Sequence, residues 1–125
     1  MTSRQDEIWN RACLEDGGSE AREGDRALAS LLQAHGLIMN GGVLHAIEAL
    51  SQEERAAAIA GYRYFGLLAA AQILSQHHEG TDAAEHAANS TYALAVRDDD
   101  VLVHAFRVLL LAHPEAFSPV RAAQA

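Results

Sequence analysis

Histidine and carboxylate side chains gather in the third quarter of this 125-residue chain, which contains seven histidines in all. The densest cluster consists of His77, His78, Glu79, Asp82, Glu85 and His86. Imidazole and carboxylate groups are ligands for zinc and related metals. One hypothesis is therefore a metal-binding module, or a small metal-dependent enzyme, that uses His77, His78, Asp82 and His86.

The spacing of these residues argues against such a site. Gly80 and Thr81 interrupt the cluster, so the side chains do not share one helical face, and zinc sites on helices usually show a closer H-x-x-x-H pattern. Asp100 and His104, four residues apart, also have ligand spacing on a helix. We favour solvated histidines at helix ends, and we expect no metal and no cofactor.

The sequence contains no set of residues suited to nucleophilic or phosphate chemistry. Cys13 lacks the basic neighbours that activate a thiol, and its spacing from Trp9 predicts a buried, packed side chain. The glycine pairs at 17–18 and 41–42 lack the preceding strand and the patterns of phosphate-binding loops. Adjacent carboxylates diverge on a helix, so capping and solubility explain them better than acid-base catalysis. We expect no catalytic residue and a non-enzymatic protein.

Composition favours a single helical domain over residues 1–125. Half of the residues are hydrophobic, and a chain of this length can bury a core without disulfides. The lone cysteine and an amino terminus without a basic-then-apolar signal predict a reducing cytoplasm. The net charge of -8 repels phosphates and anionic lipid, which argues against direct nucleic-acid or membrane binding.

Apolar residues recur at helical spacing along the whole chain, and no alternating strand pattern appears. We expect a compact irregular bundle of six or seven helices without a sheet. The spacing predicts one helix from about Asp25 to Met39, with His35 as a hydrogen-bonded core residue. The buried stripe expected on this helix consists of Leu28, Leu31, Leu32, His35, Ile38 and Met39. The spacing also predicts burial of Leu94, and it places the nearly all-apolar helix that follows Asp100 close to the centre.

Several short motifs predict where helices begin and end. Ser3, the Ser51–Glu54 pair and Thr81 or Asp82 are typical N-caps. Asn40, Gly41 and Gly42 tolerate positive φ and predict a structural turn between packed helices, with a ligand-contacting loop as the alternative. The stretch 16–25 is expected to be an exposed acidic loop. Pro114 opens a final short turn before a frayed tail at 118–125.

Acidic side chains are the remaining distinctive feature. The candidates for contacts with a basic partner are Glu53, Glu54, Glu79, Asp82, Glu85, Asp98, Asp99 and Asp100. If several of them lie on one face, the domain presents a negative surface to such a partner. The alternative is a solvated exterior that keeps the protein soluble.

Two stretches carry a resemblance to a known family: "HGLIMNGGVLHAIEAL" with "GYRYFG", and "DDDVLVHAFRVLLLAHPEAFSPV". The shared features are the break at 40–42, the aromatic step from Tyr62 to Gly66 and the closing segment 114–117. They resemble a bacterial domain of unknown function whose namesake is an acidic, dimeric DNA-mimic protein. The resemblance implies an all-helical, non-catalytic fold whose acidic side chains imitate DNA phosphates against a transcription factor. It assigns no individual acidic residue as a contact.

Three hypotheses follow. The first is a non-enzymatic, acidic, cytoplasmic domain that binds another protein, with a basic, DNA-binding regulator as the specific case. The second is the metal-binding module described above. The third is a structural homodimer in which the apolar edge of the helix from Leu28 to Met39 packs against its copy.

Overall fold

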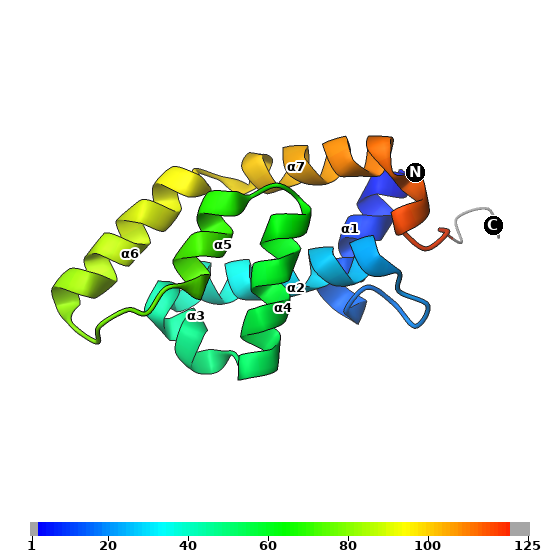
Figure 1. The fold of residues 1–125 in the computed structure, drawn as a ribbon. Helices are drawn as coiled ribbons and strands as arrows, with labels where there is room; N and C mark the ends of the chain where they lie inside the picture. Colours follow the sequence, from blue (N-terminus) through cyan, green and yellow to red (C-terminus); the bar gives the residue numbers. More distant parts are fainter. Residues whose placement is uncertain (1–2, 121–125) are drawn as a thin grey trace.

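The computed structural model describes residues 3–120, and these form an all-helical fold (Figure 1). The elements are α1 (Arg4–Glu15), α2 (Glu23–Gly41), α3 (Val43–Ala49), α4 (Gln52–Tyr64), α5 (Leu68–Ser75), α6 (Asp82–Ala95), α7 (Asp99–Ala112) and the short 3₁₀ helix η1 (Pro114–Ala116). No strand occurs in this part of the chain. The predicted fold class, with six or seven helices and no sheet, is confirmed.

Helix α2 is the central element, because it contacts α1, α3, α4 and η1. Its buried stripe includes Leu28, Leu31 and Ile38, as the spacing predicts. Helix α4 crosses α2 closely at Gly61, where an added Cβ would lie 2.5 Å from the carbonyl oxygen of Ala27. A side chain at this position would therefore force the two backbones apart.

One continuous hydrophobic core joins all seven helices. Its fully buried members include Ile8 of α1, Leu31 of α2, Val43 of α3, Tyr62 of α4, Leu74 of α5, Tyr92 of α6 and Phe106 of α7. Helices shorter than about 12 residues are marginal in water on their own. Helices α3 and α5, of 7 and 8 residues, therefore depend on this shared core.

The predicted N-caps are confirmed. The Ser3 hydroxyl accepts a hydrogen bond from the Asp6 amide at 3.1 Å, and the Thr81 hydroxyl accepts one from the Ala84 amide at 3.1 Å. Ser51 and Glu54 form a reciprocal capping box at the start of α4. Caps of this kind each stabilise a helix by about 1 kcal/mol, so polar residues set the starts of α1, α4 and α6.

Helix α2 ends at Gly41, two residues later than the sequence predicts. The helix continues through Asn40 and Gly41, and only Gly42 leaves it, with φ 95° and ψ 173°. This backbone conformation is essentially restricted to glycine. The Asn89 side chain of α6 then accepts a hydrogen bond from the Val43 amide at 2.8 Å, which caps the start of α3. The expected helix end at Met39 is therefore wrong, although a glycine turn between packed helices is present.

Helix α7 lies along one side of the molecule, across the top of Figure 1, and its expected central position is wrong. It buries only the stripe of Leu102, Phe106 and Leu110. Val108 is 53% exposed and Leu111 is 78% exposed on the same helix. A helix that is apolar on most sides can thus lie at the surface, because hydrophobicity alone does not say which side meets the core.

Three smaller burial expectations are also corrected. Cys13 is exposed, because α1 turns Ile8 and Ala12 toward the core and the next residue faces away. Met39 and Leu94 are exposed as well, at the ends of helices that turn their last residues away from the core. No helix among residues 3–120 has the length and apolar character needed to cross a membrane.

Candidate protein-interaction surface

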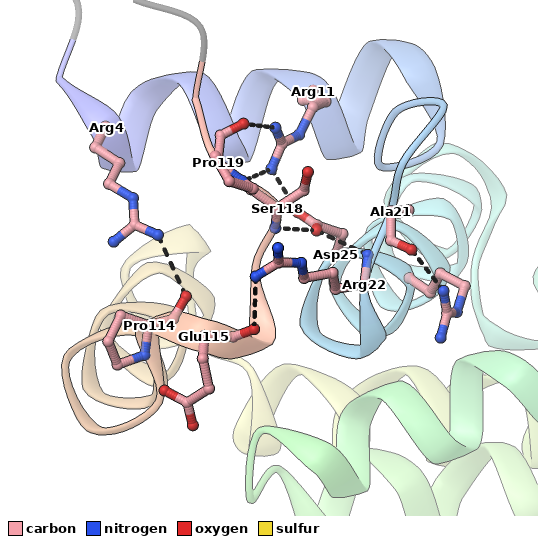
Figure 2. Close-up of polar contacts among 10 residues, drawn as sticks. Arg4, Arg11, Ala21, Arg22, Asp25, Pro114, Glu115, Ser118 and Pro119 are labelled. Atoms are coloured by element: carbon pink, nitrogen blue, oxygen red, sulfur yellow. Dashed lines mark hydrogen bonds and ion pairs between the residues drawn. The ribbon is translucent and has the colours of Figure 1, made fainter.

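An ion pair in the interior fixes α1 against the start of α2 (Figure 2). A guanidinium nitrogen of Arg11 lies 2.7 Å from Oδ1 of Asp25, and both side chains are largely buried. The second carboxylate oxygen of Asp25 accepts from the Arg22 amide at 3.0 Å and from the Ser118 amide at 2.7 Å. The buried carboxylate is thus fully partnered, which a charge in this position requires. The expectation that residues 16–25 form an exposed loop is therefore wrong at its carboxyl end.

The same arginine-rich region holds the segment 114–119 against α1 and α2, as Figure 2 shows. Arg4 donates to the carbonyl oxygen of Pro114 at 3.2 Å, and Arg22 donates to that of Glu115 at 3.2 Å. Arg11 donates to the carbonyl oxygens of Ser118 and Pro119 at 2.9 and 3.2 Å. The prediction of a frayed tail from residue 118 onward is wrong at its start, because Ser118 is buried and forms hydrogen bonds with Asp25 and Arg11. Residues 121–125 of that expected tail lie outside the described part of the chain.

Five of the eight arginines between residues 3 and 120 donate to backbone carbonyl oxygens, and none of the five pairs with a surface carboxylate. Arg26 donates to the carbonyl oxygen of Ala21, and Arg55 donates to those of Leu74 and Gln76. Between residues 3 and 120, Arg11–Asp25 is the one ion pair that joins an arginine to a carboxylate. The acidic excess of the sequence is therefore carried by exposed side chains that lack arginine partners.

The predicted acidic contact residues lie before or at the starts of three different helices. Glu53 and Glu54 open α4, Asp82 and Glu85 open α6 just after Glu79, and the run Asp98–Asp100 opens α7. Figure 1 shows the starts of α4 and α7 on different sides of the molecule. Negative charge at a helix start is favoured by the helix dipole. These groups thus have a local structural role and are distributed around the fold.

Two of these acidic residues show that local role directly. Glu54 accepts a backbone hydrogen bond from Ser51 at 2.9 Å and a side-chain bond from Gln33 at 2.8 Å. These bonds, the backbone bond first, hold the pKa of the Glu54 carboxyl below its usual value. Asp98 accepts from the Asp100 amide at 3.0 Å and so caps α7.

A polar relay crosses the core and ends at Asp99. Nε2 of His35 lies 3.0 Å from the Asp99 carboxylate, and Nδ1 lies 2.8 Å from the Tyr92 hydroxyl. The Tyr92 hydroxyl lies 2.6 Å from that of Tyr62. With a neutral imidazole, Tyr62 donates to Tyr92, Tyr92 donates to Nδ1, and Nε2–H donates to Asp99. Every hydrogen then has an acceptor, and the prediction that His35 is a hydrogen-bonded core residue is confirmed.

The relay is structural in its geometry although it resembles an acid-base chain. Both hydroxyl groups are enclosed in the core, and burial is the largest cause that raises the pKa of Tyr62 and raises that of Tyr92 to about 12. A phenol held in its neutral form without access to solvent is a poor nucleophile or base. What the relay does is tie α2, α4 and α6 to the first turn of α7.

The histidine cluster does not form a ligand set in the structure. Over residues 3–120, no group of three or more His, Cys, Asp or Glu side chains is arranged to hold a metal ion. Nε2 of His78 instead donates to the carbonyl oxygen of Ile73 at 2.7 Å, while His77, Asp82 and His86 are exposed. His78 thus ties the loop before α6 to α5.

The apolar edge that a second copy would need on α2 is used inside the chain. Leu28, Leu31 and Ile38 are buried in the core, and Met39, the last member of the expected stripe, is 68% exposed. A homodimer through this edge would require the fold to open.

A groove of about 690 Å³ lies between α7 and the corner that joins α4 to α5. We call it the α7 groove. It is lined by Phe65, Gly66, Leu67, Arg97, Asp98, Asp100, Val101, His104, Ala105, Val108 and Leu109. A second cavity, of about 400 Å³, lies beside the turn at 40–42 and includes Asn89 and Tyr92. Asp98 and Asp100 are among the predicted contact residues, whereas no sequence motif marks the apolar walls of the groove.

The chain was compared with known protein families, curated proteins and solved structures, and no match was found in any of the three comparisons.

Proposed function

We propose that this protein is a non-enzymatic, acidic helical domain that binds a basic protein. The observation that supports the proposal is the use of the arginines. Arg4, Arg11, Arg22, Arg26 and Arg55 donate to backbone carbonyl oxygens, and one carboxylate in the described part of the chain, that of Asp25, pairs with an arginine. A guanidinium group that donates to a carbonyl oxygen keeps its charge, so the net charge of -8 already includes these arginines, and the exposed carboxylates without an arginine partner are the groups that a basic protein can contact.

Exposed, unpaired carboxylates act on a partner before contact. Charges on a protein surface raise the rate of encounter with an oppositely charged partner and repel partners of like charge. The carboxylates at the starts of α4, α6 and α7 are exposed or half-buried, so they can contribute to this attraction. The same field disfavours nucleic acid and anionic lipid as direct partners.

DNA mimicry is the more specific form of this proposal. It is supported by the acidic balance and by the family resemblance in residues 35–66 and 98–120, which implies a DNA-binding regulator as partner. In that case the partner uses one basic surface for DNA and for this domain. Duplex DNA added to the complex is then expected to release the partner from this protein. A partner that binds duplex DNA and this protein at the same time would contradict DNA mimicry.

The proposal is tested by capturing partners from a lysate of the native organism on the immobilised protein. The partner is expected to bind the immobilised protein at low salt. It is expected to be released at about 1 M salt, where the Debye length falls to about 3 Å. A variant with Glu79→Gln, Asp82→Asn and Glu85→Gln removes three charges and is expected to capture less at low salt. Circular dichroism checks that this variant folds. Capture that is equal at both salt concentrations and in both proteins would contradict the proposal.

The alternatives have their own measurements. Elemental analysis of the purified protein tests the metal-binding hypothesis, which requires at least one metal ion per chain. Light scattering at micromolar concentration tests the homodimer hypothesis, which requires twice the mass of the 13.4 kDa chain.

A further inference from the structure

The α7 groove combines an apolar wall with charged side chains at one end. Val101, His104, Val108 and Leu111 follow each other at three- and four-residue spacing, so they lie along one stripe of α7. Val108, which lines the groove, and Leu111, one turn further along the same stripe, are both exposed. Apolar side chains that gather beside a groove on a water-exposed surface typically mark an interaction site.

The groove is negatively charged at the end where α7 begins. Asp98 and Asp100 line it there together with Arg97, so the charged lining carries one net negative charge, and Asp99 lies between the two aspartates in sequence. Neither Asp98 nor Asp100 forms an ion pair with an arginine of the described chain. Eight residues separate Asp100 from Val108, which is about 12 Å along a helix. The charged end and the apolar wall are thus separate parts of one surface.

We propose that the α7 groove binds an amphipathic helical segment of the basic partner, with apolar side chains against Val101 and Val108 and Lys or Arg side chains beside Asp98 and Asp100. This assignment rests on the proposed function and names the surface and the chemistry that it recognises. Helices bind grooves in this way through apolar anchors at three- and four-residue spacing.

Charge and shape favour this occupant over a purely apolar one. A guanidinium or ammonium group beside Asp98 and Asp100 forms charge-assisted hydrogen bonds with two exposed carboxylates that have no arginine partner. A segment without basic residues would leave these carboxylates desolvated and unpaired, which disfavours binding. The walls formed by Phe65, Leu67 and Leu109 offer apolar contacts and no backbone edge, so an extended strand has nothing to pair with.

The probe is a fluorescent synthetic helix of leucine and lysine with one apolar face. Its affinity is measured by anisotropy against the intact protein, beside a scrambled peptide of the same composition and a leucine–glutamate version. The lysine helix is expected to bind at low salt, the scrambled peptide about tenfold more weakly, and the glutamate version not measurably. This result would show that binding to the protein requires both an ordered apolar face and positive charge on the peptide.

Variants assign the binding to the groove. Val108→Asp places a charge on the apolar wall, and Leu94→Asp places one on an exposed site of α6 that does not line the groove. Asp100→Asn removes a charge at the groove, and Glu48→Gln removes one on the exposed surface of α3, outside the groove. Both groove variants are expected to weaken binding about tenfold, which corresponds to about 1.4 kcal/mol, and both controls are expected to leave it within about twofold. Val108→Ser is the second wall variant in case Val108→Asp unfolds.

Each result distinguishes the groove assignment from the broader function. If the groove variants and the control variants lose equal affinity for the lysine helix, then the helix does not bind in the α7 groove. The proposed salt-sensitive binding of a basic partner would not be affected by that result. No binding of the lysine helix by the intact protein at low salt would also overturn the groove, while the lysate experiment judges the function separately. A dimer in sedimentation that Val108→Asp converts to a monomer would show that a second copy occupies the groove, and it would overturn the assignment.

Discussion

A guanidinium nitrogen of Arg11 lies 2.7 Å from Oδ1 of Asp25, and this contact joins the first two helices to the last described segment of the chain. Asp25 also accepts from the Ser118 amide, 93 residues away in sequence. Arg11 in turn donates to the carbonyl oxygen of Ser118. One buried charge pair therefore holds three distant parts of the sequence together.

Replacement of Asp25 by Asn is expected to destabilise the fold strongly. The change keeps the shape of the side chain but leaves the largely buried Arg11 without its counter-charge. Breaking one side of a buried ion pair costs about 3–5 kcal/mol, and urea denaturation measures it. Glu23→Gln, two residues away and exposed at the start of α2, is the matched control and should change stability by no more than about 0.5 kcal/mol. Equal effects of the two substitutions would mean that the pair does not hold the segments together.

The tyrosine relay predicts an order of stability among conservative variants. Tyr92→Phe removes the central hydroxyl, so the Tyr62 hydroxyl and Nδ1 of His35 both lose a buried partner, at a cost of about 2–4 kcal/mol. Tyr62→Phe removes a terminal hydroxyl and leaves Tyr92 donating to His35, at a cost of about 1 kcal/mol. Urea denaturation of both variants and of the double variant measures the coupling between them. A relay in the proposed direction is contradicted if Tyr62→Phe is the more damaging change.

The buried tyrosines also predict a loss of stability at high pH. The pKa values of both are raised in the folded state, that of Tyr92 to about 12, above the value of about 10 expected in the unfolded chain. Neutral phenols therefore stabilise the fold fully below about pH 10, and this contribution is lost as the pH rises from about 10 to about 12.

This loss is observable as a coupled transition. Ionisation of Tyr62 and Tyr92, followed by absorbance at 295 nm, is expected to coincide with loss of helical circular dichroism. In the double variant with phenylalanine at both positions, the stability should depend less on pH above 10. If all tyrosines ionise near pH 10 while the helical signal persists, then the two hydroxyls are not buried as described.

The turn at Gly42 predicts opposite effects for two glycine substitutions. Gly42→Ala puts a side chain on a backbone with φ 95°, with its Cβ 3.0 Å from Oδ1 of Asn89, and should destabilise by about 1–3 kcal/mol. Gly36→Ala, on an open helical position of α2, should stabilise by about 0.5–1 kcal/mol. Thermal unfolding of both variants is the measurement. A neutral Gly42→Ala would show that this backbone relaxes without cost.

Features set by neighbours three or four residues apart could be predicted from the sequence. The capping box of Ser51 and Glu54, the cap at Ser3 and the stripe from Leu28 to Ile38 depend on such local spacing. The place of His35 was predictable for the same reason, because a polar residue on a buried stripe needs a hydrogen-bond partner. Its partner Tyr92, 57 residues away, was not predictable.

Features set by distant residues could not be predicted in this way. Asp25 is acidic and follows a glycine-rich stretch, so it was predicted to be exposed, yet its burial depends on Arg11 and on Ser118. The orientation of α7 was missed because almost every position in that helix is apolar, and the pattern then contains no information on which face meets the core. The α7 groove depends on that orientation. Its carboxylates were therefore predictable as charged residues, whereas the apolar side chains that form its walls were not predictable as a site.

The proposed function is most directly tested by the salt dependence of affinity between this protein and a captured partner. If unneutralised carboxylates drive association, the dissociation constant rises steadily with salt, and the rise is shallower in the variant that lacks the charges of Glu79, Asp82 and Glu85. A dissociation constant that does not change with salt, or that changes equally in both proteins, would contradict a charge-driven interaction.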